Sequence, residues 1–185
     1  MKAPVFVIPG IGSSGPNHWQ SLWEATDPSF TRLELADWDH PECSTMVAAI
    51  EEQTNVLAVP FVVVAHSLGC LAFAHWASKC RPQIVGALLV ALPDPTGPRF
   101  PSDAIGFSKV PLKTMPFKTI VVFSDDDPFS TSDFSMACAQ AWGSSSISLG
   151  KAGHINAASN LGHWREGLYL LDELRSPNII VSGEV

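Results

Sequence analysis

Short apolar runs alternate along this chain with longer stretches in which apolar residues recur every three or four positions. The run at residues 61–65 is rich in β-branched side chains and does not alternate with polar ones, which is typical of a strand covered on both faces. The longer stretches have the period of amphipathic helices. The pattern predicts strands at 4–8, 30–35, 61–65, 84–92, 118–123 and 146–149, and helices at 18–26, 44–58, 68–80, 132–142 and 163–175. Ser44 is the expected N-cap of the second helix.

Strands that alternate with helices predict an α/β fold with right-handed crossovers. We expect about six mostly parallel strands, with helices on both faces of the sheet. In sheets of this kind, ligands bind beyond the carboxyl ends of the strands. The loops that follow the strands are therefore where we look for chemistry.

One of these loops, residues 93–116, contains six prolines. Proline removes a backbone donor and fixes φ, so no long helix fits there. We expect an ordered surface loop that lines one wall of a cleft, with a disordered linker as the alternative. The apolar residues in the loop favour packing; they are Ile105, Phe107, Val110 and Leu112.

The size of the chain is that of a single domain, which we place at residues 1–176, followed by a C-terminal tail at 177–185 that is frayed or forms a short extension. Hydrophobic residues make up 46% of the chain and charged residues 16%, which suits a packed core and not a disordered protein. The formal net charge of −7 argues against a nucleic-acid partner, because phosphate binding needs a basic face.

No apolar run approaches the roughly 18 residues that a membrane span needs, and the N-terminus lacks the pattern of a signal peptide. We therefore expect no membrane partner and a cytoplasmic location. The cysteines are scattered without a C-x-x-C pair, so free thiols are expected in place of disulfides or a metal site. They are Cys43, Cys70, Cys80 and Cys138.

The segment Ala65-His66-Ser67-Leu68-Gly69 lies between a predicted strand and a predicted helix. It has the form of a nucleophile elbow, G-x-S-x-G, with alanine at the first glycine. Residues 65 and 69 are expected to lie close to each other, so both must be small. The turn would lift the Ser67 hydroxyl above the sheet edge and place the Leu68 N–H at a helix N-terminus, where it can donate to an oxyanion. The alternative is a serine that only caps the helix.

A serine nucleophile needs a base, and the base needs an orienting carboxylate, in the chain order Ser, Asp or Glu, His for this fold. Three aspartates follow the strand at 118–123, and we prefer Asp127 because Pro128 fixes the turn after it. Asp125 and Asp126 stay open as alternatives, and Asp94 is a lesser one. A solvated acidic turn is the non-catalytic reading of this cluster.

The base is expected to be His154, because it occupies the loop after the last strand and Gly153 allows the turn that points its ring inward. His66 is a poor base, since adjacent side chains diverge at an elbow. His75 is expected to pack inside a helix, and His163 to cap the last helix or contact substrate. His18 and His40 complete the set of six.

The second oxyanion donor should come from the loop after the first strand, which contains Gly10, Ile11 and Gly12. We expect the Ile11 amide to donate, with Gly12 next in line. A phosphate-binding loop is the alternative, but the loop has neither the G-x-G-x-x-G spacing nor a Walker lysine.

Taken together, "IPGIGSSGPNHWQ", "ADWDHP", "VVVAHSLGC", "SDDDPF" and "GHINAASNLGHWREG" make the chain similar to the retinoblastoma-binding protein 9 family of small serine hydrolases, a branch of the α/β-hydrolases. The resemblance spans nearly the whole chain. It implies an α/β-hydrolase fold with a minimal lid, and a Ser67, Asp127, His154 triad. It also implies that a small residue other than glycine is usual at Ala65, and that Trp19 and Trp38 lie near the cleft.

The expected reaction is acyl transfer to water, without metal or organic cofactor, on a small ester or amide. Short-chain carboxylic esters are the first choice, and an aminopeptidase or amidase with the same triad is the alternative. A non-catalytic protein-binding module of the same fold would show a broken triad, and a dehalogenase would have Asp in place of Ser67. The oligomeric state stays open. The residues expected to bind substrate are Gly10, Gly12, His66 and Trp38.

Overall fold

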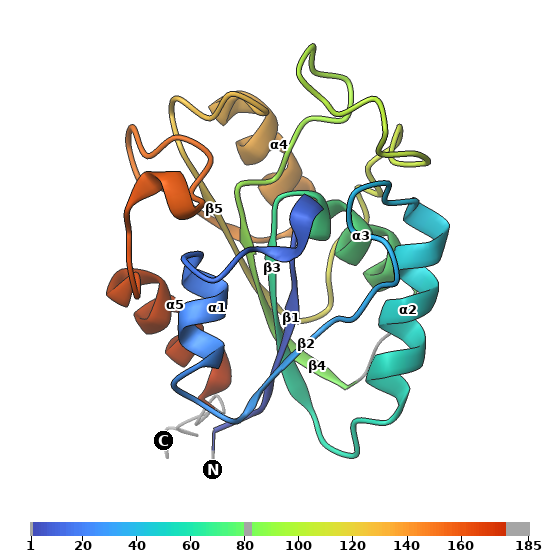
Figure 1. Cartoon of the computed structure of the whole chain (residues 1–185), viewed down its shortest axis with the longest axis vertical. Helices are drawn as coiled ribbons and strands as arrows, with labels where there is room; N and C mark the ends of the chain where they lie inside the picture. Colours follow the sequence, from blue (N-terminus) through green and yellow to red (C-terminus); the bar gives the residue numbers. More distant parts are fainter. Residues whose placement is uncertain (1, 80–82, 177–185) are drawn as a thin grey trace, which may run out of the picture.

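The computed structural model describes residues 2–79 and 83–176 (Figure 1). The expected free thiol at Cys80 and the expected tail at 177–185 lie outside these ranges. The described chain forms one six-stranded sheet in the order β2-β1-β3-β4-β5-β6, and every neighbouring pair is parallel. The predicted α/β architecture is confirmed.

Each of the six predicted strands is found; β5 has the predicted bounds, and the other five have shifted ends. The edge strand β2 is the shortest, because only its first three residues pair with β1. The four inner strands are almost wholly buried, as their continuous apolar runs predict. The strands are β1 (Val5–Ile8), β2 (Phe30–Arg32), β3 (Phe61–His66), β4 (Ile84–Val90), β5 (Lys118–Phe123) and β6 (Ser145–Ser148).

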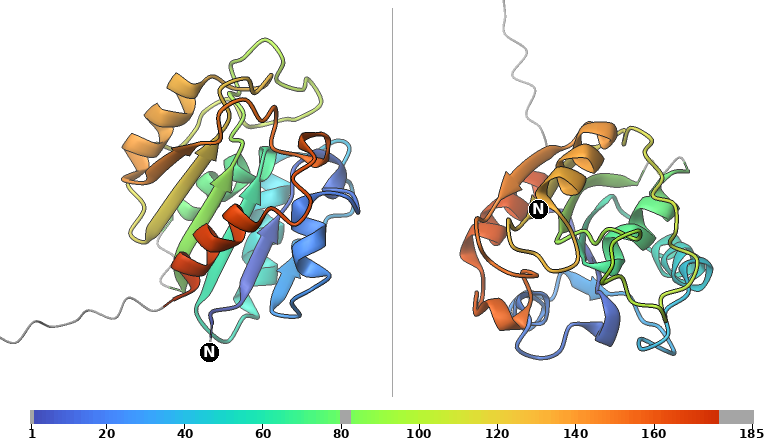
Figure 2. Two further views of the ribbon diagram at one scale, coloured as in Figure 1. Left: turned by 90° about the vertical axis from the view of Figure 1, so that its left-hand side faces the viewer. Right: turned by 90° about the horizontal axis from the view of Figure 1, so that it is seen from above.

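Helices cover both faces of the sheet (Figure 2). Successive residues of a strand point to opposite faces, so Phe6 and Ile8 pack under α2, α3 and α4, whereas Val5 and Val7 pack under α1 and α5. The helices are α1 (Trp19–Glu24), α2 (Cys43–Asn55), α3 (Leu68–Ala77), α4 (Ser132–Trp142) and α5 (Arg165–Arg175), with short 3₁₀ turns η1 (Ile11–Ser13) and η2 (Ala157–Ser159).

The prediction of Ser44 as the N-cap of α2 is wrong, because the N-cap is Glu42. Ser44 lies inside the first turn, and its hydroxyl donates to the Glu42 carboxylate at 2.6 Å. The helix starts early because the chain before it pairs with the proline-rich loop: the Cys43 N–H donates to the Ile105 carbonyl, and the Ile105 N–H donates to the Pro41 carbonyl. This pairing holds Glu42 in an extended conformation.

Residues 93–116 are all described and contain no helix, as their prolines predict. The loop is tied down at several points, including a hydrogen bond from the Trp142 indole N–H to the Pro111 carbonyl at 2.8 Å. Phe107 is fully buried, but the expected packing is wrong for Ile105 and Leu112, which are 64% and 58% exposed. The main chain of Ile105 makes the hydrogen bonds to Pro41 and Cys43, whereas its side chain is exposed. Across the described ranges, no helix is long and apolar enough to cross a bilayer.

Candidate active site

Ser67 occupies the sharp corner between β3 and α3. Its backbone has φ 54° and ψ −127°, a conformation that non-glycine residues rarely adopt. Its N–H donates to the Val90 carbonyl of β4, which extends the sheet through the corner. Ser67 holds the N-cap position, yet its side chain makes no capping hydrogen bond. The reading of Ser67 as a helix cap is therefore wrong, and its hydroxyl is left for another partner.

Gly69 is required by the end of β1. A Cβ atom at this position would lie 2.5 Å from the carbonyl oxygens of both Ile8 and Pro9. We expected residue 69 to be small because of Ala65. The nearest obstacle is instead the main chain that leaves β1, against which α3 packs directly. A Cβ atom at Gly10 would lie 2.8 Å from the Ser67 Cβ, so the loop after β1 lies against the serine.

Three side chains that are distant in sequence meet at the carboxyl edge of the sheet. The Ser67 Oγ lies 2.8 Å from the His154 Nε2, and the His154 Nδ1 lies 2.9 Å from each carboxylate oxygen of Asp127. A carboxylate only accepts, so Nδ1 carries the proton and Nε2 presents its lone pair to the hydroxyl. The side chains of His154 and Asp127 are 10% and 2% exposed. Burial of this kind strengthens hydrogen bonds that involve a charge.

The other three candidate carboxylates, all in the described ranges, have different partners. Asp126 accepts from the Ser124 hydroxyl and from the Gly153 N–H at 2.7 Å. Asp125 accepts from two serine hydroxyls, and Asp94 from the amide and hydroxyl of Thr96. These aspartates shape turns, and Asp126 ties the loop of Asp127 to the loop of His154.

Ile11 and Leu68 both line the cavity above Ser67. Neither backbone N–H donates to a protein acceptor within the described part of the chain. The reserve donor, Gly12, does not fit, because its N–H donates to the Trp38 carbonyl at 3.3 Å. Gly12 has a left-handed φ of 73°, which glycine adopts without strain.

A cavity of about 550 Å³ opens over Ser67 and His154. Gly10, Gly12 and His66 line it as expected, but Trp38 does not. The Trp38 side chain is half-buried and packs against the core on the face of the sheet that α2, α3 and α4 cover. Apart from histidines, no acidic or basic side chain is among the described residues that line the cavity. Its other lining residues are Ile11, Ser14, Gly15, His18, Ser67, Leu68, Pro93, Phe100, Pro101, Phe129, His154, Asn156, Ala157 and Ala158.

The aromatic wall of this cavity was not predicted. Phe129 packs edge-on against His154, with ring centroids 4.6 Å apart. Its position two residues after Asp127, in a loop that follows a strand, was the available signal. Phe100 comes from the proline-rich loop, which does line one wall of the cavity as expected.

Three imidazoles in the lining of the cavity contact one another in succession. The ring centroids of His18 and His66 are 4.6 Å apart, and those of His66 and His154 are 5.1 Å apart. Burial lowers the pKa of His66 well below its ordinary value of 6.5, and burial also lowers the pKa of His18 to about 4. Both rings are therefore neutral at pH 7 and place no positive charge beside His154.

The low pKa of His18 predicts a loss of stability in acid. The unfolded chain takes up a proton at His18 near pH 6.5 and the folded chain only near pH 4. The contribution of His18 to the free energy of unfolding is therefore fully present above pH 6.5 and is lost as the pH falls toward 4. This one residue contributes about 3 kcal/mol over that interval. Urea denaturation at a series of pH values measures the effect.

His18→Asn is the matched control for that experiment. Asparagine can still accept the Gln20 N–H that the His18 Nδ1 accepts at 3.2 Å, and it does not titrate. We expect the slope of stability against pH below 6.5 to fall by about 1.4 kcal/mol per pH unit in this variant. Identical slopes in the two proteins would contradict a depressed pKa at His18.

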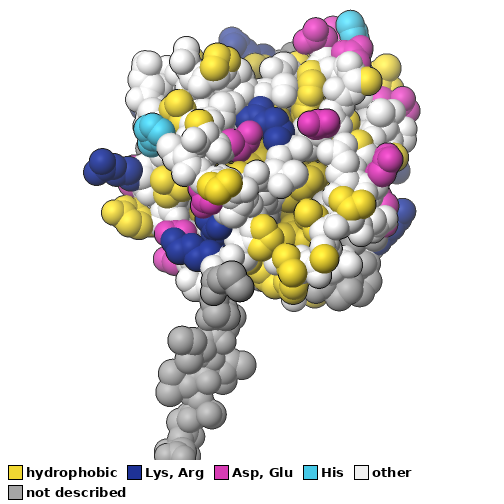
Figure 3. Space-filling model, turned by 60° about the horizontal axis from the view of Figure 1, so that its bottom comes forward, with side chains coloured by type: hydrophobic (Ala, Val, Ile, Leu, Met, Phe, Trp, Pro, Cys, Tyr) yellow, Lys and Arg dark blue, Asp and Glu magenta, His cyan; other side chains and the backbone are white. Residues whose placement is uncertain are grey.

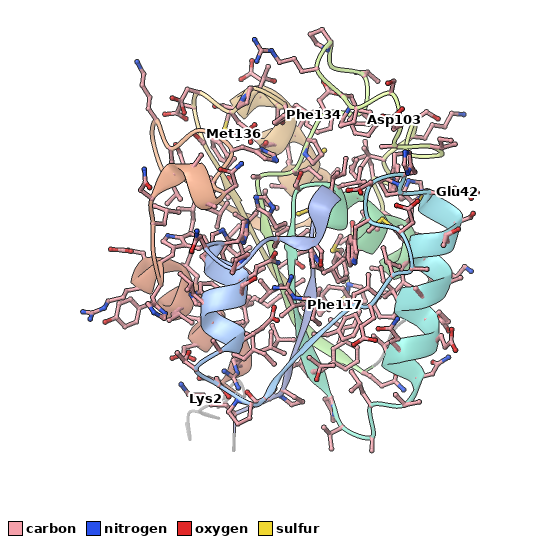
Figure 4. The ribbon with its side chains drawn as sticks, in the orientation of Figure 1. Lys2, Glu42, Asp103, Phe117, Phe134 and Met136 are labelled. Atoms are coloured by element: carbon pink, nitrogen blue, oxygen red, sulfur yellow. The ribbon has the colours of Figure 1, made fainter. Side chains whose placement is uncertain are left out.

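A second cavity lies at the amino-terminal ends of the strands, at the opposite end of the sheet. Apolar side chains gather on this lower face (Figure 3), and Val59, Val85 and Phe117 line the cavity. In Figure 4, Lys2 lies at this lower end and Asp103 at the upper end. The basic residues around the second cavity form ion pairs, for example Lys118 with Glu173 at 3.3 Å. The described residues that line this second cavity include no histidine or cysteine, so the upper cavity is the candidate active site.

No group of three or more His, Cys, Asp or Glu in the described ranges is arranged to hold a metal ion. The three described cysteines, Cys43, Cys70 and Cys138, are buried and unpaired. Burial raises the pKa of the Cys43 thiol and of the Cys138 thiol to about 11 each, so these thiols are not nucleophiles at neutral pH.

The all-parallel sheet and the strained serine corner define the class of this protein as an α/β-hydrolase. A family model described as serine hydrolase matches residues 5–173. The chain belongs to this family, which confirms the likeness to small serine hydrolases.

Solved structures agree. A YdeN-like hydrolase from Pectobacterium atrosepticum is 30% identical, with a TM-score of 0.83 over 94% of this chain and 91% of that one. The ydeN gene product of B. subtilis is 18% identical, with a TM-score of 0.76 over 93% and 98% of the two chains. A thermophilic esterase from Thermogutta terrifontis is 15% identical, with a TM-score of 0.70 over 94% and 91%. The last two show a shared fold. A search of curated proteins found no match.

Proposed function

We propose that this serine hydrolase cleaves short, uncharged carboxylic esters through an acyl-enzyme on Ser67. The observation that carries the proposal is the hydrogen-bonded series from Ser67 through His154 to Asp127 at the floor of an uncharged cavity. No step of the reaction calls for a metal or organic cofactor. The substrate is a small molecule, and the cytoplasm is the proposed location.

In the proposed mechanism, His154 takes the proton of the Ser67 hydroxyl through Nε2 as the oxygen attacks the ester carbonyl. Asp127 stabilises the imidazolium that forms and keeps the proton on Nδ1. The amides of Leu68 and Ile11 donate to the developing oxyanion. His154 then protonates the leaving alcohol, and a water molecule, activated in the same way, releases the acid.

The lining of the cavity favours an ester substrate over an aminoacyl one. An aminopeptidase must pair the free ammonium group of its substrate, because a buried unpaired charge is costly. The described residues that line the cavity include no carboxylate that could pair with the ammonium group. Apart from the histidines, they include no basic side chain that could pair with a substrate carboxylate. Phe100, Phe129 and Ile11 instead offer apolar contact to a short acyl chain.

A panel of nitrophenyl esters from acetate to octanoate, a succinyl ester and aminoacyl nitroanilides tests the proposal. We expect the largest kcat/KM with a short neutral ester, and turnover close to background with the charged ester and the aminoacyl amides. A fluorophosphonate probe should label the same protein. Comparable turnover of an aminoacyl amide would favour the aminopeptidase. No turnover and no labelling would favour the non-catalytic module.

A further inference from the structure

The structure assigns a positioning role to two buried ring N–H groups, those of His66 and Trp19. We propose that they hold the main chain of His154 and Ile155 so that the His154 imidazole stays against Ser67. This inference rests on the proposed function and goes beyond it, because it explains how the base is kept in place. We call the two donors and the two carbonyls that they bind the loop clamp.

The clamp consists of two adjacent hydrogen bonds. The His66 Nε2 lies 3.0 Å from the His154 carbonyl oxygen, and the Trp19 indole N–H donates to the Ile155 carbonyl at 2.8 Å. A carbonyl only accepts, so His66 is the Nε2–H tautomer. His66 is 4% exposed and Trp19 is 1% exposed, so water does not readily replace either donor. A buried carbonyl that loses its donor is destabilised, because water does not replace the lost hydrogen bond.

The main chain that the clamp holds is in a strained conformation. Ile155 has φ 46°, in the left-handed region that a β-branched residue rarely enters. Such a conformation is strained and persists only where its surroundings fix it. On the other side of His154, Gly153 has φ 60° and donates its N–H to Asp126. The direction of the imidazole therefore depends on main chain that would relax if it were released.

The position of His66 links the base to the nucleophile. His66 is the last residue of β3 and immediately precedes Ser67. One residue therefore fixes the start of the serine corner through the strand and the base loop through its side chain. A displacement of about 1 Å in a reacting group can cost about 10²-fold in rate. Loss of the clamp should lower kcat and leave KM nearly unchanged, because neither hydrogen bond is made to substrate.

Trp23 provides the matched control. Its indole N–H donates to the His163 carbonyl at 2.6 Å, farther along the same segment and past η2. Trp23 is 1% exposed, like Trp19, and the two rings pack on each other with centroids 4.6 Å apart. Tryptophan to phenylalanine removes the same kind of N–H at both positions. Only the Trp19 bond lies next to the base.

The first experiment compares Trp19→Phe with Trp23→Phe. We expect Trp19→Phe to lower kcat on the best nitrophenyl ester roughly 10- to 100-fold with little change in KM. Trp23→Phe should keep kcat within about twofold at a similar loss of thermal stability. Equal kcat values in the two variants would overturn the inference.

The second experiment varies the side chain of His66. A glutamine amide N–H reaches about as far as Nε2, whereas the shorter asparagine amide does not. His66→Asn and His66→Leu should lower kcat roughly 10- to 100-fold, and His66→Gln should recover most of that loss. If His66→Leu does not fold, the comparison of glutamine with asparagine carries the test. The same kcat in both amide variants would contradict a clamp.

A third measurement needs no substrate. The Nδ1 proton shared by His154 and Asp127 should give a far-downfield proton NMR signal that exchanges slowly with water while the ring is held. We expect faster exchange in Trp19→Phe and His66→Asn, and exchange like that of the parent protein in Trp23→Phe. Uniform exchange in all variants overturns the clamp even if no ester is turned over. Absence of labelling in the parent protein with an intact signal counts against the proposed function alone.

Discussion

Ser67→Ala is expected to lower kcat on the best nitrophenyl ester by about 10⁶. The proposed nucleophile is the Ser67 Oγ, which has the His154 Nε2 at 2.8 Å and makes no capping bond that would keep it in a structural role. Alanine removes the attacking atom and leaves the corner, the base and the cavity in place. Labelling by a fluorophosphonate should disappear, and thermal unfolding should change little.

Ser130→Ala is the control for this variant. The Ser130 hydroxyl contacts Ser135 and does not line the cavity, so its loss should leave both turnover and labelling at the parent level. A Ser67→Ala protein that is still labelled as fast as its parent would exclude Ser67 as the nucleophile. Loss of turnover in an unfolded Ser67→Ala protein would be recognised by its melting curve.

Much of the fold follows from local pattern. A run such as "FVVVA" at 61–65 is typical of a strand that is covered on both faces in the interior of a parallel sheet, and β3 lies between β1 and β4. The convergence of Ser67, Asp127 and His154 then follows from topology, since each stands in a loop after a strand and the loops after parallel strands meet at one edge. This is why the three residues that the structure brings together could be proposed from the sequence.

Hydrogen bonds to distant main-chain carbonyls could not be predicted in this way. The Ile105 carbonyl moves the start of α2 to Cys43, and the Trp38 carbonyl occupies the Gly12 N–H. Residue type does not mark Ile105 or Trp38 as the partner, because every residue has a backbone carbonyl. The bond from Trp19 to Ile155 is of the same kind. The pattern of apolar and polar residues predicted where the loops lie. Only the folded structure shows which backbone atoms of these loops form hydrogen bonds.

Asp127→Asn is expected to lower kcat by about 10⁴ at neutral pH, with the fold unchanged. Asp127 Oδ1 also accepts the Phe129 N–H at 2.9 Å, so an asparagine oxygen would keep that bond and its NH₂ group would face the His154 Nδ1. The imidazole would then accept at Nδ1 and carry its proton on Nε2, where it cannot take the proton of Ser67. Steady-state kinetics on the best ester measures the loss.

The neighbouring aspartates make this prediction specific. Asp125→Asn and Asp126→Asn remove a charge from the same turn, but neither carboxylate contacts His154. Asp125→Asn should keep kcat within about threefold, since exposed charges contribute little. Asp126→Asn should cost more, up to about tenfold, because Asp126 accepts the Gly153 N–H beside the base. If either neighbour proved as damaging as Asp127→Asn, the loss would reflect the charge of the turn, and the assignment of Asp127 as the orienting carboxylate would fail.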